Sequence, residues 1–107
     1  MTSHQRFGVE TTQENSGVAR LVVRGELDLS TVPVLHAALD DISETKPSRL
    51  EIDVTELTFC DSSGLHEFGR AAEFCATNKA SMSVIGAQNI VRRVFEVSGL
   101  GHLLAPT

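Results

Sequence analysis

The stretch FCDSSGLHEFG, residues 59–69, decides the fold of this chain of 107 residues. Its apolar approach ends at DSSG, residues 61–64, and an apolar pattern with helical spacing begins at Leu65. Asp and Ser are preferred at helix N-caps because their side-chain oxygens accept hydrogen bonds from free N–H groups of the first turn. The stretch therefore predicts a junction that leads into a helix, with Asp61, Ser62 or Ser63 as the cap.

The predicted helix has an apolar stripe and a mixed stripe opposite it. The apolar stripe follows the i, i+3, i+4, i+7 rule and contains Leu65, Phe68, Gly69, Ala72, Cys75 and Ala76. The opposite stripe is predicted to be exposed and contains Ser63, Glu67, Arg70 and Phe74. An aromatic, an arginine and a serine on one exposed stripe match the composition of partner surfaces, although lone exposed apolar residues are also normal.

Working outward, the remaining patterns predict strands and helices in alternation. Strands are predicted at RFGVETT (6–12), VARLVVRGELDL (18–29), RLEIDV (49–54) and SMSVIG (81–86). Helices are predicted at STVPVLHAALDDISETKP (30–47) and QNIVRRVFEVSGLG (88–101), and residues 102–104 form a short edge strand or a packed tail. The order ββαβαβα indicates one α/β domain over residues 1–107, a small mixed β-sheet with helices packed on it.

The loop after the second strand carries two acids. Gly25 is predicted to allow a bulge or a close backbone approach. Leu27 is predicted to point into the core, which turns Glu26 and Asp28 toward solvent. Ser30 or Thr31 is predicted to cap the next helix, so neither acid is needed for that purpose. Both acids then belong either to a solvated loop or to a partner contact.

Composition bounds the partners and the compartment. The formal net charge is −5, which argues against nucleic acid or an anionic membrane as a partner. No apolar run approaches the roughly 20 residues of a membrane helix, and MTSHQRFGVE at the start has no apolar signal core. We therefore expect a cytoplasmic protein that is a monomer or a weak homodimer.

The cysteines and histidines give no sign of a metal or a cofactor. Cys60 and Cys75 form no CxxC motif and are predicted to be reduced, buried thiols. The histidines, His4, His36, His66 and His102, have no metal-ligand spacing.

The DSSG junction allows three chemistries: a helix cap, a nucleophile or a modified serine. A hydrolase would use Ser63 with His102 and Asp28, or Cys60 with His66, but the string lacks the first glycine of G-x-S-x-G. A phosphorylated serine in a first helical turn would add a charge of about −1.5 to −2. With Asp61 and Glu67 nearby, that charge is expected to repel a partner.

Three stretches resemble the STAS domain, specifically the stand-alone anti-sigma-factor antagonists of bacteria. They are GELDLST (25–31), LTFCDSSGL (57–65) and VRRVFEVSGL (91–100). The resemblance implies a protein without enzymatic activity that binds an anti-sigma factor, usually also a serine kinase, and so releases a sigma factor. It also implies that phosphorylation before the glycine of the motif ends binding and that a serine phosphatase restores it.

Carried onto this sequence, the resemblance makes Ser63 the phosphorylation site, with Ser62 as the alternative, and Gly64 is expected to leave room for the kinase. His66 and Glu67 depart from the family pattern, which often has a small and an apolar residue there. The candidate partner-binding residues are Gly25, Glu26, Asp28, Asp61, Ser62, Ser63, His66, Glu67, Arg70 and Phe74. A STAS module in another signalling assembly and a small serine or cysteine hydrolase are the alternative functions.

Overall fold

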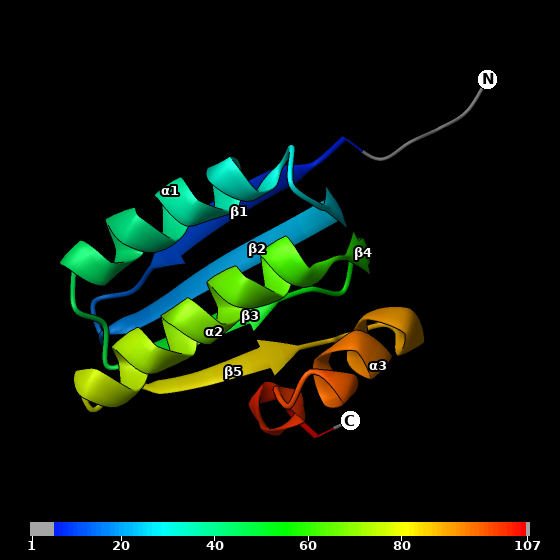
Figure 1. Ribbon diagram of the computed structural model, residues 1–107. Coiled ribbons are helices and arrows are strands. Elements are labelled where there is room, and N and C mark those ends of the chain that lie inside the picture. Colours follow the sequence, from blue (N-terminus) through cyan, green and yellow to red (C-terminus); the bar gives the residue numbers. More distant parts are fainter. Residues whose placement is uncertain (1–5, 107) are drawn as a thin grey trace.

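The computed structural model describes residues 6–106, which form an α/β fold with a mixed sheet (Figure 1). The strands are β1 (Gly8–Gln13), β2 (Val18–Leu27), β3 (Arg49–Asp53), β4 (Leu57–Cys60) and β5 (Ser81–Ile85). The helices are α1 (Val32–Glu44), α2 (Ser62–Thr77), α3 (Asn89–Val97) and the 3-10 turn η1 (Gly101–Leu103). The predicted fold class is confirmed, and the observed order ββαββαβα adds one strand to the prediction.

The added strand, β4, is too short for an alternating pattern to reveal it. It pairs in parallel with the end of β2, where Glu26 lies opposite Phe59, and the register shifts between Gly25 and Glu26. Gly25 has a φ of +94°, and a Cβ there would lie 2.8 Å from Cα of Phe7. Both the bulge and the close approach predicted for Gly25 are therefore confirmed.

The sheet brings the carboxyl ends of its parallel strands to one edge. Its order is β1-β2-β3-β5, with β1 antiparallel to β2 and the pairs β2–β3 and β3–β5 parallel. Helices α1 and α2 cross one face side by side, and both begin where β2 and β4 end (Figure 1). Two helix N-termini are thus placed together at this edge.

The core lies between the sheet and the helices. Leu39 of α1, Phe68 of α2 and Phe95 of α3 are all buried, and the rings of Phe68 and Phe95 meet edge to face with centroids 5.0 Å apart. Cys60 and Cys75 are buried free thiols, as predicted. The predicted tail folds as η1 and then makes a single parallel bridge, in which Leu104 pairs with Val84.

Candidate functional site

The start of α2 is capped by Asp61, one of the three predicted candidates. Its Oδ1 accepts hydrogen bonds from the N–H of Ser63 at 2.9 Å and from the N–H of Gly64 at 3.3 Å. The Ser63 hydroxyl donates to the same oxygen at 2.6 Å. The bond from the Ser63 hydroxyl, together with the two N–H groups, lowers the pKa of Asp61 despite partial burial, so the cap is charged at neutral pH.

The two serines at this junction differ in environment. Ser62 is exposed, and Ser63 is half-buried with its hydroxyl engaged by Asp61. Gly64 is buried, and a Cβ on it would lie 2.6 Å from Cδ2 of Leu27 and 2.9 Å from Sγ of Cys60. The expectation that Gly64 leaves room for a kinase is therefore wrong, because the glycine lets α2 pack closely against β2 and β4.

Asp28 repeats this arrangement at the start of α1. Its Oδ1 accepts from the N–H of Ser30 at 3.0 Å, the hydroxyl of Ser30 at 2.7 Å and the N–H of Thr31 at 3.1 Å. Thr31 stands at the N-cap position but makes no side-chain cap bond. Its hydroxyl instead donates to the carbonyl of Glu26 at 2.8 Å.

The prediction that Ser30 or Thr31 caps α1 is confirmed for the position, which Thr31 occupies, although no side chain makes a cap bond there. The carboxylate of Asp28 holds the turn that leads into α1. The hydroxyl of Ser30 and the neighbouring N–H groups lower the pKa of Asp28. Leu27 is buried and Glu26 is exposed, as predicted. Asp28, by contrast, is half-buried and has a structural role.

We expect Asp28→Ala to lower the Tm by several degrees at pH 7, because the turn that leads into α1 loses the hydrogen bonds that Asp28 Oδ1 accepts. Asp28→Asn should lower the Tm by less, since its amide oxygen can still accept these hydrogen bonds. The pKa of Asp28 in the folded state lies below its ordinary value. The contribution of its carboxylate to the free energy of unfolding is therefore complete above about pH 4 and is lost as the pH falls further. Thermal melts at pH 7 and pH 3 measure this, with Glu26→Gln as the exposed control. An Asp28→Ala protein that melts like the wild type at pH 7 contradicts this role of Asp28 in the turn.

Glu67 does not lie on an exposed stripe as predicted, because its side chain points between α1 and α2. It is 6% exposed, and its carboxylate lies 3.0 Å from Nδ1 of His36 and 2.9 Å from Nη2 of Arg70. Burial opposes its ionisation, yet the hydrogen bonds from His36 and Arg70 hold the pKa of Glu67 below its ordinary value. Asp40 closes the network, 3.2 Å from Nε2 of His36 and 3.1 Å from Nη1 of Arg70.

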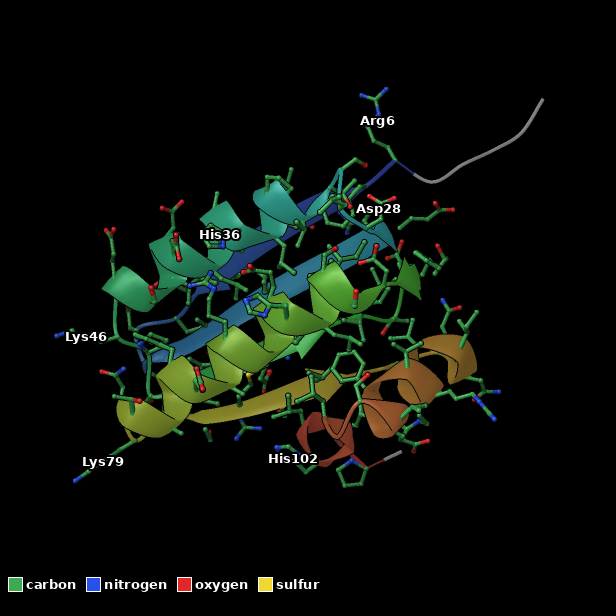
Figure 2. All side chains as sticks on the ribbon, in the orientation of Figure 1. Arg6, Asp28, His36, Lys46, Lys79 and His102 are labelled. Carbon is green, nitrogen blue, oxygen red and sulfur yellow. The ribbon has the colours of Figure 1, made fainter. Side chains whose placement is uncertain are left out.

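This network was missed from the sequence. His36 and Asp40 are four residues apart on one helix, which is a weak signal of pairing. Only the packing of α1 beside α2 brings Glu67 and Arg70 to them, and Figure 2 shows His36 between the two helices.

Phe74 is also not the exposed aromatic that was predicted. It is half-buried and packs against the core. Together with Arg70, Leu39 and Cys75 it lines a cavity of about 70 Å³ between α1 and α2. The buried face of α2 is wider than a single apolar stripe because it contacts both the sheet and α1, and it includes Ala71 but not the exposed Ala76.

The predicted partner residues therefore separate into two groups. Around the starts of α1 and α2 lie Glu26, Asp28, Asp61, Ser62 and Ser63, with His66 exposed about one turn further on. Asp28 and Asp61 are near enough to interact electrostatically. Gly25 is buried beneath this group, whereas Glu67, Arg70 and Phe74 lie between the helices. Two exposed apolar residues of this region were not predicted as site residues. Leu29 follows Asp28 in the chain, and Phe59 lies opposite Glu26 in the pairing of β2 with β4.

Residues 10–105 match the family model described as "Mlab, STAS domain". The chain belongs to the STAS domain family. It is 27% identical to an anti-sigma-B factor antagonist of Listeria monocytogenes over 92% of this chain and 86% of the relative. Among solved structures, an anti-sigma factor antagonist from Mycobacterium paratuberculosis superposes with a TM-score of 0.84 at 26% identity, covering 95% of this chain and 87% of that one.

A further solved structure shares the fold of this STAS domain. Bacillus SpoIIAA in its phosphorylated form superposes with a TM-score of 0.76 at 19% identity, covering 94% of this chain and 91% of that one.

The relatives of this STAS domain are named as anti-sigma factor antagonists and not as enzymes. Burial raises the pKa of the Cys60 thiol to about 12, with a further contribution from Asp61, so this thiol is not a nucleophile at neutral pH. Figure 2 shows His102 on the opposite side of the molecule from Asp28, which rules out the Ser63–His102–Asp28 combination. Within residues 6–106, no hydrogen bond joins Ser63 or Cys60 to a histidine.

The remaining observations concern metals and membranes. Residues 6–106 contain no cluster of three metal-ligating side chains, and His4 lies outside the described residues. None of the described helices is both long and apolar enough to cross a bilayer.

Proposed function

We propose that this STAS domain is an anti-sigma-factor antagonist. In its unphosphorylated state it binds an anti-sigma factor that is also a serine kinase, and binding releases the sigma factor. Phosphorylation of Ser63 ends binding, and a serine phosphatase restores it. The relatives named as anti-sigma factor antagonists, and the phosphorylated form of a protein with the same fold, support this proposal.

The observation that carries the proposal is the state of the Ser63 hydroxyl. It stands in the first turn of α2, at the edge where the parallel strands end, and within residues 6–106 its one hydrogen bond goes to the Asp61 cap. We define the partner face as Glu26, Asp28, Leu29, Phe59, Asp61, Ser62, Ser63 and His66. Gly25 positions this face, and Glu67, Arg70 and Phe74 fix α2 against α1 beneath it.

We expect the cognate kinase to modify Ser63 and not Ser62. The hydroxyl of Ser63 is already oriented by a carboxylate, whereas no hydrogen bond fixes the hydroxyl of Ser62 within residues 6–106. Phosphopeptide mapping after incubation with candidate anti-sigma kinases and ATP measures this, with Ser63→Ala and Ser62→Ala as matched variants. Modification that persists in Ser63→Ala and disappears in Ser62→Ala would overturn the assignment.

The proposed partner is tested separately by capture from host lysate. Unmodified protein and Ser63→Asp protein are used side by side. An anti-sigma factor retained only by the unmodified protein supports the proposal. Components of another signalling assembly, without any anti-sigma factor, would favour the alternative of a STAS interaction module.

A further inference from the structure

Asp61 serves three donors through a single oxygen. Its Oδ1 accepts from the N–H groups of Ser63 and Gly64 and from the hydroxyl of Ser63. The Asp61 carboxylate is charged at neutral pH, since its pKa is lowered by these bonds, and Asp28 already repels it. The start of α2 therefore holds one anion, in a position where a second negative charge already lies close by.

Phosphorylation of Ser63 would change this balance at short range. The Ser63 Oγ bonds to the γ-phosphorus of a nucleoside triphosphate, the bond from that phosphorus to the β-phosphate oxygen breaks, and the hydroxyl proton leaves to solvent. The donor that lay 2.6 Å from Asp61 is then gone. In its place stand about −1.5 to −2 charges and three acceptor oxygens.

The phosphate and the Asp61 carboxylate then compete for the same two N–H groups. A helix N-terminus favours anions, and the more highly charged phosphate gains more from it. Two anions within a few ångström of each other repel, and Asp28 adds to that repulsion. The two anions are thus not stable together at this helix start.

We propose that Asp61 is the residue that senses the modification: the phosphate on Ser63 takes over the N–H groups of Ser63 and Gly64 and expels the Asp61 carboxylate from the cap. This inference rests on the proposed function for the choice of Ser63. Asp61 also donates its own N–H to the carbonyl of Leu27 at 3.1 Å, so its displacement reaches the Glu26–Asp28 loop on the same partner face.

The test uses phosphoserine encoded genetically at position 63, in the Asp61 chain and in Asp61→Asn. The amide side chain of the Asp61→Asn variant can still accept the cap bonds but has no charge, so it does not repel the phosphate. We expect phosphoserine to raise the unfolding equilibrium constant about tenfold more in the Asp61 chain than in Asp61→Asn, as measured by urea denaturation. Amide NMR signals of Ser63 and Gly64 should shift with phosphate ionisation in both chains.

Phosphoserine at position 62 is the matched control, because the Ser62 side chain makes no hydrogen bond to Asp61 within residues 6–106. Its effect should differ by less than about threefold between the two backgrounds. An equal effect of phosphoserine at position 63 in both backgrounds, or equal coupling at positions 62 and 63, overturns the inference. No kinase or anti-sigma factor enters this test, so its failure is distinct from failure of the kinase mapping and lysate capture.

Discussion

Gly64→Ala is expected to destabilise the fold by about 2–3 kcal/mol, the upper part of the range for overpacked cores. The added Cβ would lie 2.6 Å from Cδ2 and 2.7 Å from Cγ of Leu27, whose side chain is fully buried. It would also lie 2.9 Å from Sγ of Cys60, so α2 must shift away from both β2 and β4. The same displacement would move Asp61 and Ser63 at the partner face.

Gly69→Ala is the matched control for this prediction, since it makes the same change in the same helix. A Cβ on Gly69 meets no atom within 4 Å, and replacing a glycine inside a helix by alanine stabilises by about 0.5–1 kcal/mol. Urea denaturation of both variants measures the difference. Two variants of equal stability would mean that the contact of Gly64 with Leu27 does not limit how closely α2 approaches the sheet.

The second large effect is expected at Ser63 itself. Ser63→Asp should weaken binding to the anti-sigma factor by about 30- to 100-fold, because a charge is added beside Asp61 and Asp28 in a desolvated interface. Ser63→Ala should bind within about threefold of the wild type, since Asp61 keeps its N–H donors from residues 63 and 64.

Isothermal calorimetry with the purified anti-sigma factor measures these affinities. Circular dichroism of each variant confirms that it is folded. Ser62→Asp adds the same charge at a neighbouring exposed position. It shows how much of the loss of affinity depends on the position of the charge. Wild-type affinity of both Ser63→Asp and Ser63→Ala would contradict the repulsion mechanism. Equally weakened binding of both variants would also contradict it and would show that the hydroxyl itself is needed for binding.

What the sequence determined was local. The polar DSSG string predicted an N-cap, and Asp61 provides it because capping depends only on residues within one turn. The bulge at Gly25 and the burial of Leu27 were both predicted. Each of these follows from backbone conformation or from alternation along one strand.

What only the tertiary structure decided was which side chains meet across elements. The spacing of apolar residues on α2 predicts one buried stripe. Because α1 lies beside α2, the side chain of Glu67 is also buried and that of Phe74 is half-buried. Glu67 tolerates that position because His36 and Arg70, from the neighbouring helix and its own, satisfy the carboxylate. No local spacing predicts that pairing, since His36 lies 31 residues away.

The same distinction explains the errors at Asp28 and Gly64. Ser30, Thr31 and Asp28 are all competent caps, and local propensity does not choose among them. The loop decides, because the Thr31 hydroxyl donates to the carbonyl of Glu26, while Asp28 accepts from the N–H groups of Ser30 and Thr31 in the turn before the helix. From the sequence, Gly64 was expected to leave room for a kinase. Its role in the structure is to let α2 contact Leu27 on β2 and Cys60 on β4. Such close contacts between elements depend on how densely the folded protein packs, and no local pattern in the sequence reveals them.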